Sequence, residues 1–148
     1  EEEDTMAVHM ADLNSSLMRD MESGEVTGRV VDLVNEIDRI LLEKKITDTL
    51  LLSDSYFLTG FYYQSVNMYS RAIENFTISA RLRESAGIYD MRYSYCLNNL
   101  AATLFRTGNY SRAYDTGLRG LAARRLVIGS DSHHSQIIIS IWQASALR

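Results

Sequence analysis

The sequence predicts an all-α protein in which antiparallel helical hairpins stack as an α-solenoid of six to seven helices. Three observations lead to this fold class. The 148 residues include no proline, the residue that most often interrupts a helix. Apolar residues recur at spacings of three and four along most of the chain, whereas no alternating strand pattern competes with them. Several residues also recur after a constant interval, which is typical of stacked repeats.

The composition is that of a soluble globular domain, with 46% apolar and 23% charged residues. The net charge of −4 argues against nucleic-acid binding through a basic surface. No run of 18 apolar residues exists, so the sequence predicts no membrane span. A single cysteine, Cys96, cannot form an internal disulfide, which indicates a reducing compartment. We therefore expect a cytoplasmic protein, associated with the cytoskeleton in one interpretation. Because the chain opens on Glu1 and not on Met, we expect it to be part of a larger protein.

Charge is distributed unevenly along the chain. Residues 1–25 contain eight acids and one arginine, a net charge of −7, so the remaining residues carry +3. Residues 1–5 are expected to be an acidic, disordered end. Between positions 92 and 125 there are six arginines and one acid, Asp115. This stretch is interpreted either as ordinary helix surface or as a surface that faces an acidic partner.

Two helices are predicted within residues 6–45, where apolar residues twice follow one helix face. Ser23-Gly24 separates the two sets, and Lys44-Lys45 suits the C-terminus of the second helix. The sets are Met6, Met10, Leu13, Leu17 and Met21, followed by Val26, Val30, Leu33, Ile37 and Ile40. This hairpin is interpreted as a cap or as a degenerate repeat.

Five further helices are predicted after residue 46. Thr47 or Asp48 is a plausible N-cap for the third helix, and Asn67 for the fourth. Gly87 ends the fourth helix, and Thr107-Gly108-Asn109 separates the fifth from the sixth. Asp131 or Ser132 is expected to cap the seventh helix. The expected ranges are 49–64, 68–85, 89–106, 110–128 and 132–148.

An interval of 41 residues relates the third and fourth expected helices to the fifth and sixth. It separates Gly60 from Ala101, Tyr69 from Tyr110 and Ala72 from Ala113. Small residues allow two helices to approach closely, and the aromatic residues Tyr63 and Phe76 are expected to fill the wedge between hairpins. The interval therefore predicts two hairpins of the same design, over about 49–86 and 89–128, followed by a half repeat over 132–148.

At these residues the chain resembles a tetratricopeptide repeat of the kinesin-light-chain type. The resemblance rests on Leu97-Asn98-Asn99-Leu100-Ala101 and on Gly108-Asn109-Tyr110-Ser111-Arg112-Ala113, and it covers about residues 50–148. In that family a linker resembling Leu-Gly-x-Asp-His-Pro follows the second helix. Here the linker is Ile128-Gly129-Ser130-Asp131-Ser132-His133, without the proline and with the histidine displaced by one position.

The resemblance implies a superhelix whose first helices line a concave groove that holds an extended peptide or a partner helix. It implies a non-catalytic adaptor or scaffold that takes a protein or peptide partner, which the arginine excess suggests is partly acidic. Asn98 and Asn99 have an alternative interpretation as helix surface or local polar contacts, and Phe105 and Phe57 have one as core residues. The expected peptide-binding residues are Asn98, Asn99, Arg106, Phe105, Tyr95, Phe61 and Gln64.

Members of the family that bind chaperone tails clamp a C-terminal carboxylate with lysines and arginines. The aligned positions here hold Asp54, Leu58, Tyr95 and Asn99, and no lysine follows Lys45. Binding of a chaperone tail is therefore disfavoured.

The sequence offers no convincing catalytic, cofactor or metal site. His133 and His134 are adjacent and cannot share a helix face, and no cluster of cysteine or acidic residues accompanies them. Asp131, Ser132 and His133 are contiguous, which does not allow the geometry of a catalytic triad. We therefore expect a protein that is not an enzyme and that uses neither a cofactor nor a metal ion. Cys96, within an apolar helix, is expected to be buried.

The alternative function is self-association for the assembly of a cytoskeletal or multi-protein complex, in which the last helix forms a dimer interface. As the first helix of an incomplete unit, it would expose one apolar flank. The expected interface residues are Ile141, Trp142 and Ile138, with the face from Met6 to Met21 as a weaker candidate. In a third interpretation the last helix folds back onto the fifth and sixth helices and hides this flank.

Overall fold

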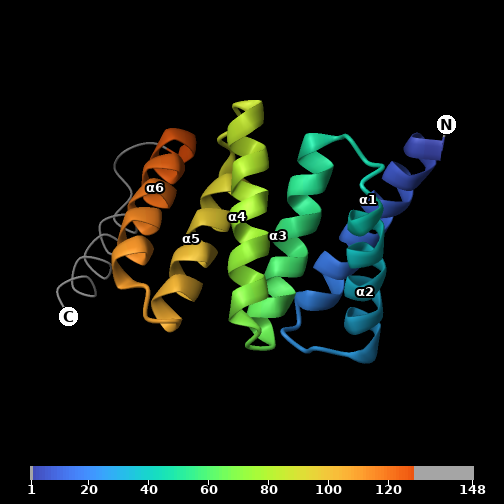
Figure 1. Cartoon of the computed structure of the whole chain (residues 1–148), viewed down its shortest axis with the longest axis horizontal. Helices are drawn as coiled ribbons and strands as arrows, with labels where there is room; N and C mark the ends of the chain where they lie inside the picture. The colour runs from blue at the N-terminus through green and yellow to red at the C-terminus, as the bar shows by residue number, and fades with distance from the viewer. Residues whose placement is uncertain (1, 129–148) are drawn as a thin grey trace. The chain divides into compact units, whose positions relative to one another are not determined.

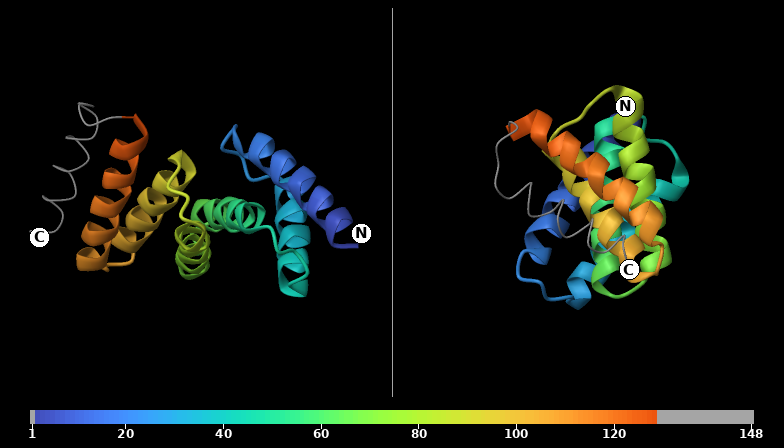
Figure 2. Two further views of the ribbon diagram at one scale, coloured as in Figure 1. Left: turned by 90° about the horizontal axis from the view of Figure 1, so that it is seen from above. Right: turned by 90° about the vertical axis from the view of Figure 1, so that its left-hand side faces the viewer.

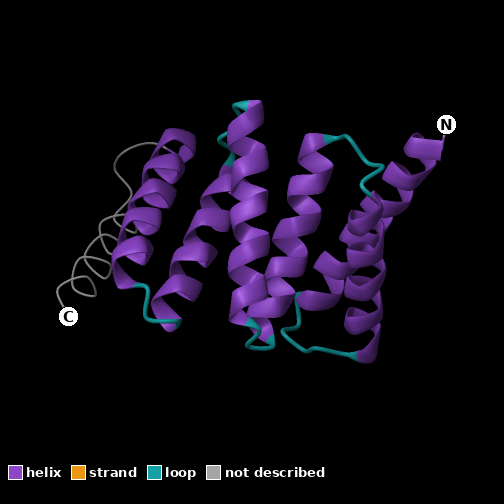
Figure 3. Ribbon diagram, in the orientation of Figure 1, coloured by secondary structure: helices purple, strands orange, loops and turns teal. Residues whose placement is uncertain are grey.

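The computed structural model describes residues 2–128, and every regular element in that range is an α-helix (Figures 1 and 3). The predicted all-α class and its antiparallel hairpins are thereby confirmed. The chain divides into two compact units, Glu1–Leu82 and Arg83–Arg148. The expected seventh helix lies outside the described residues. The helices are α1 (Glu2–Met21), α2 (Gly28–Glu43), α3 (Thr49–Ser65), α4 (Tyr69–Ala86), α5 (Met91–Arg106) and α6 (Tyr110–Ile128).

The first hairpin, α1 and α2, is held by the apolar faces that the sequence predicts. Met10 and Leu17 on α1 and Val34 and Ile37 on α2 are almost completely buried. Thr27 caps α2, because its hydroxyl accepts a hydrogen bond from the backbone N–H of Val30 at 3.2 Å. The two helices pack against each other.

The acidic start of the chain differs from the expectation of disorder, because α1 already begins at Glu2. Three acids, Glu2, Glu3 and Asp4, occupy its first turn, where they complement the positive end of the helix dipole. Glu2 also pairs with Lys45 at 3.1 Å, and the hydroxyl of Thr47 donates to Glu3. These contacts tie the start of α1 to the segment between α2 and α3.

The second hairpin, α3 and α4, is closely packed at Gly60, as predicted, and Phe76 on α4 is the residue that meets it. A Cβ on Gly60 would lie 2.9 Å from the ring of Phe76, which is completely buried. Polar groups also cross this interface. The amide of Asn75 donates to the hydroxyl of Thr59 at 2.9 Å, and Ser53 donates to the carbonyl oxygen of Ser79 at 2.9 Å.

The third hairpin, α5 and α6, is closely packed at Gly120. A Cβ there would lie 3.1 Å from the Cβ of Leu97. Ala101 and Ala113, two small residues that the repeat predicts, are completely buried, and so is Cys96. The two helices lie side by side in Figures 1 and 2.

The turns of the second and third hairpins share one pattern of hydrogen bonds at the predicted interval of 41 residues. The backbone N–H of Met68 donates to the carbonyl of Tyr63 at 2.8 Å, and that of Asn109 to Leu104 at 2.9 Å. Each turn has a second backbone bond of 3.1 Å. The N–H of Asn67 donates to the carbonyl of Gln64, and the N–H of Gly108 donates to the carbonyl of Phe105. Both turns are therefore Schellman-type helix ends.

This pattern corrects the role of Asn67. The sequence suggested an N-cap for α4, but Asn67 has a φ of 64° and ends α3 in the left-handed conformation. Its counterpart Gly108 has a φ of 85°. Asparagine is among the few residues other than glycine that adopt this conformation readily, which explains why it stands here.

An aspartate caps the start of two helices, one at the predicted position and one two residues later than expected. Asp48 caps α3 by accepting from the N–H of Leu51 at 3.0 Å, as predicted. Asp90 does the same for α5 through the N–H of Tyr93 at 2.9 Å, so α5 begins at Met91 and not at Tyr89. The bounds of α6 are those expected.

Candidate functional site

The outer face of α5 is the surface on which most of the expected peptide-binding residues lie. The inner face is buried and includes Leu97, Leu100 and Leu104. Tyr95, Asn98 and Arg106 are exposed, and 45% of the Tyr95 surface is accessible. Their spacing places all three on one side of the helix, with half-buried Ala102 between them.

The two asparagines have different surroundings. Asn99 is half-buried, and its side-chain amide donates to the carbonyl oxygen of Tyr95 in its own helix at 2.8 Å. This is the local polar contact that was the alternative interpretation for the pair. Asn98 is exposed. Of the two, Asn98 is therefore better placed to contact a partner.

Phe105 contributes to packing at the end of the helix. It is half-buried, and its ring centre lies 5.2 Å from that of Tyr110 in an edge-to-face arrangement. Such aromatic pairs add to the stability gained from burial alone. Tyr110 keeps 48% of its surface exposed, so the pair forms an aromatic end to the α5–α6 turn beside exposed Arg106.

Two expected site residues, Phe61 and Gln64, lie on α3 in the unit Glu1–Leu82. Phe61 has 36% of its surface exposed, and Gln64 is half-buried. Phe57 on the same helix instead packs against Phe76, with ring centres 5.9 Å apart, which agrees with its interpretation as core.

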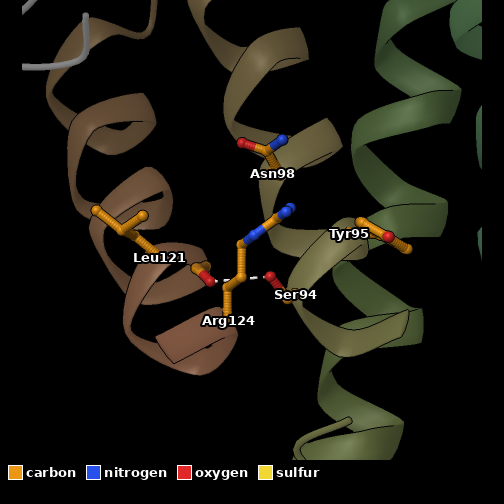
Figure 4. Close-up of a pocket in the computed structure, with 6 residues that line it drawn as sticks. Ser94, Tyr95, Asn98, Leu121 and Arg124 are labelled. Carbon is orange, nitrogen blue, oxygen red and sulfur yellow. Dashed lines mark hydrogen bonds between the residues drawn. The ribbon is translucent and has the colours of Figure 1, made fainter. Parts of the chain in front are cut away.

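A small cleft opens between α5 and α6 and includes Tyr95 and Asn98 in its lining (Figure 4). The other lining residues are Ser94, Gly120, Leu121 and Arg124. Its volume is about 10 Å³, at the lower limit for a single water molecule. This cleft cannot enclose an organic ligand, so recognition at this face has to use its outer surface.

Arg124 is a member of the cleft that the sequence did not single out. Its side chain extends from α6 between the two helices in Figure 4. The Nε atom is buried, and it has no hydrogen-bond partner. The signal that would have identified Arg124 is the 41-residue interval, which relates it to Arg83.

The two units differ in net charge. Arg83–Arg148 contains eight arginines and four acids, a net charge of +4, whereas Glu1–Leu82 carries −8. Arg106 and Arg112 are exposed in the positive unit. Arg119 pairs with Glu84, which also accepts a hydrogen bond from the hydroxyl of Tyr93 at 2.8 Å. Burial and the contact with Glu84 raise the pKa of Tyr93 to about 12.

A polar cluster that the sequence did not predict connects three helices of the unit Glu1–Leu82. The hydroxyl of Tyr63 on α3 donates to the carboxylate of Asp38 on α2. Arg71 on α4 lies over the ring of Tyr63, 4.2 Å from its centre, and 3.5 Å from Asp38. Burial raises the pKa of Asp38 above its ordinary value, although Tyr63 and Arg71 act in the opposite direction.

The expected interface residues Ile138, Ile141 and Trp142 lie outside the described residues, as do Asp131, His133 and His134. Within residues 2–128, no helix has the length and apolar character needed to cross a membrane. No protein-family model matches this chain, and no curated protein matches its sequence.

Proposed function

We propose that this chain is a protein–protein interaction module, a non-catalytic adaptor of the tetratricopeptide type that binds a peptide or partner helix along α5. The observation that carries the proposal is the outer face of α5. It presents Tyr95, Asn98 and Arg106 at helical spacing, on a helix whose opposite face is buried in the hairpin.

The three side chains supply complementary contacts for a polypeptide. A tyrosine offers a large, rigid contact area, and tyrosine and arginine are both enriched among the residues that dominate binding energies. An asparagine amide both donates to and accepts from a peptide backbone. A guanidinium pairs with a carboxylate through two parallel hydrogen bonds.

The electrostatics favour a partner that is at least partly acidic. The unit that contains α5 carries a net charge of +4, and Arg106 and Arg112 are exposed near the α5–α6 turn. An attractive field of this kind increases the rate of association and lowers affinity for basic competitors. Because the cleft of about 10 Å³ encloses no ligand, specificity would come from surface contacts spread along the helix.

The proposal is tested by selecting peptides from a random library displayed on phage, with the 148-residue chain as bait, and measuring the affinity of the selected peptide by calorimetry. Asn98→Ala is expected to weaken binding by about 1–3 kcal/mol, since it leaves a desolvated partner group unpaired. Ser111→Ala, at an exposed position of α6, is the matched control and should bind as the parent chain does.

Two results would count against this site. Undiminished binding by a Tyr95/Asn98/Arg106 triple alanine variant would place the partner elsewhere on the chain. Selection of predominantly basic peptides would contradict the electrostatic part of the proposal.

A further inference from the structure

Arg83 on α4 shows how a buried arginine is satisfied in this fold. Its side chain is 4% exposed. Its Nε donates to Oδ1 of Asp90 at 3.0 Å, and its Nη2 to Oδ2 at 3.3 Å. Burial opposes the charge of Asp90, but the bonds from Arg83 and from the N–H of Tyr93 outweigh it and lower the pKa of Asp90 below its ordinary value. The two parallel bonds neutralise both charges, so this arginine has a structural role.

Arg124 on α6 lacks such a partner. It is half-buried, its Nε atom is buried, and no group of residues 2–128 accepts a hydrogen bond from that atom. A buried donor of a charged group that is left unpaired is destabilising. Arg125 shares this property, so the missing partner alone identifies no site. The location distinguishes the two arginines, because Arg124 lines the cleft between α5 and α6 and Arg125 does not.

Gly120 explains why the Arg124 side chain lies between the two helices. Side chains of a helix lean toward its N-terminus, so Arg124 covers the position of Gly120, one turn earlier, where no side chain competes for the space. On the facing helix the hydroxyl of Ser94 donates to the carbonyl oxygen of Gly120 at 3.0 Å. Figure 4 shows the Arg124 side chain extending from α6 toward the part of α5 that carries Tyr95 and Asn98. The guanidinium is therefore adjacent to the face of α5 for which a partner is proposed above.

The polar groups at this cleft favour a ligand that accepts hydrogen bonds. A guanidinium has five N–H donors and no acceptor, and the amide of exposed Asn98 adds two more donors. The hydroxyl hydrogen of Ser94 is already bound to Gly120. The cleft, at about 10 Å³, has room for one atom of the size of a water oxygen. A carboxylate meets these conditions, because it can place one oxygen in the cleft and the other on the terminal nitrogens of the guanidinium.

We propose that Arg124 anchors the partner of the α5 face by binding the side-chain carboxylate of a glutamate or aspartate, with the Asn98 amide as a second donor. This role of Arg124 rests on the function proposed above, and it names the residue that selects an acidic partner. A polypeptide that lies along the outer face passes Tyr95 and Asn98 and reaches the cleft with a side chain, not with its end. The net charge of +4 of the unit Arg83–Arg148 favours the same chemistry.

The first experiment uses a small probe, glutamate blocked as the N-acetyl N-methylamide, whose only charge is the side-chain carboxylate. It is titrated into the 148-residue chain while NMR follows the Nε–H resonances of the arginines, which the Arg124→Gln and Arg125→Gln variants assign. The Arg124 resonance is expected to shift saturably, and that of Arg125 to stay in place. Blocked glutamine is the neutral control and should shift neither. Equal shifts at both arginines, or no shift at Arg124, overturn the proposal.

The second experiment uses the peptide selected on the parent chain. Each acidic residue of that peptide is replaced in turn by its amide, and calorimetry measures its affinity for the parent and for Arg124→Gln. One replacement should weaken binding to the parent by roughly tenfold and binding to Arg124→Gln much less, because each change already breaks the same pair. Arg125→Gln is the matched control and should bind as the parent does. Arg124→Lys, which keeps the charge without the planar fork, should bind with an affinity between those of the parent and Arg124→Gln.

Two results of this experiment contradict the proposal. One is a peptide in which no acidic side chain is coupled to Arg124, and the other is coupling to the terminal carboxylate of the peptide. If no peptide is selected at all, the adaptor function fails, while the response of Arg124 to blocked glutamate still decides whether the cleft binds a carboxylate.

Thermal unfolding without peptide separates a binding residue from a structural one. Arg124→Gln removes an unpaired buried donor and should keep or raise the midpoint of unfolding, whereas Arg83→Gln leaves Asp90 without its partner and should lower it. A loss for Arg124→Gln as large as that for Arg83→Gln would show that the fold itself neutralises Arg124, and the proposal would be wrong.

Discussion

The hydroxyl of Ser94 donates to the carbonyl oxygen of Gly120 at 3.0 Å and connects the middle of α5 to the middle of α6. Hydroxyls in a helix more often bond to a carbonyl of their own helix, as Thr103 does to Asn99. The bond between helices needs their close approach, which Gly120 provides. Since Ser53 makes the same bond to Ser79, the feature belongs to the design of the hairpin.

Gly60→Leu should destabilise the second hairpin by roughly 1–3 kcal/mol, because a side chain at this position meets the buried ring of Phe76. Thermal unfolding followed by circular dichroism measures the loss. The control is Gly28→Ala, where an added Cβ meets nothing within 4 Å. An unchanged melting temperature for Gly60→Leu would show that α3 and α4 do not meet at this residue.

Ala113→Leu should have a comparable effect on the third hairpin. Ala113 is completely buried at the start of α6, and a larger side chain would force the helices apart at a cost of roughly 1–3 kcal/mol. Ala122→Leu, at an exposed position of the same helix, is the matched control. Equal melting temperatures for the two variants would contradict the observed register of α6.

Asp90 should make the chain less stable in acid. Its pKa is lower in the folded state than the ordinary value of 3.8, so the unfolded chain binds the proton more readily. The stabilisation is complete above the unfolded pKa and is lost as the pH falls through the folded one. Urea unfolding between pH 2 and pH 6 measures this. Asp90→Asn should lose less stability on acidification than the parent chain does. If the variant keeps the parent's full pH dependence, the carboxylate of Asp90 does not bind Arg83 and Tyr93 as the structure shows.

Asp38 should change the stability of the chain with pH in the direction opposite to Asp90. Burial raises its pKa in the folded state, so the folded chain holds the proton more tightly than the unfolded chain does. Its contribution to the free energy of unfolding is largest below the ordinary pKa of 3.8 and declines as the pH rises through the folded value. In the same urea series, the stability of Asp38→Asn relative to the parent should improve from acid toward neutral pH. A constant difference would mean that the carboxyl titrates normally.

Self-association remains a prediction for the residues after 128. If the last helix forms a dimer interface, the parent chain sediments as a dimer, and Trp142→Glu sediments as a monomer because the charge is buried without a partner. Sedimentation velocity at several concentrations distinguishes the two states. Monomers of equal stability for both chains would show that Trp142 is neither interface nor core.

Much of the fold could be predicted because it depends on local rules. Apolar spacing located the helices, and Gly60, Ala101 and Ala113 marked the helix contacts. The errors occurred where one residue type serves two purposes. Asn67 suits both an N-cap and a left-handed helix end, and only the backbone bond from Met68 to Tyr63 distinguishes them. The acids at 2–4 suit both a disordered end and a first helical turn.

The polar contacts were harder to predict than the apolar ones. Asp38, Tyr63 and Arg71 come from three helices, and no spacing rule relates residues so distant in sequence. At the candidate site the sequence could predict which residues of α5 are exposed, because the exposed face of the helix follows from its buried one. It could not separate Asn98 from Asn99, since the bond of Asn99 to Tyr95 depends on the side-chain rotamer.

The Schellman-type turn between α5 and α6 makes this hairpin a favourable scaffold for engineering. Chain reversal there rests on backbone atoms and on the left-handed conformation of Gly108, while the side chains from Asn109 to Arg112 are exposed. Foreign residues grafted at positions 111 and 112 would leave in place both the bonds that close the turn and the contact of Tyr110 with Phe105. New recognition sequences can therefore be installed at this end of the hairpin without redesigning its core.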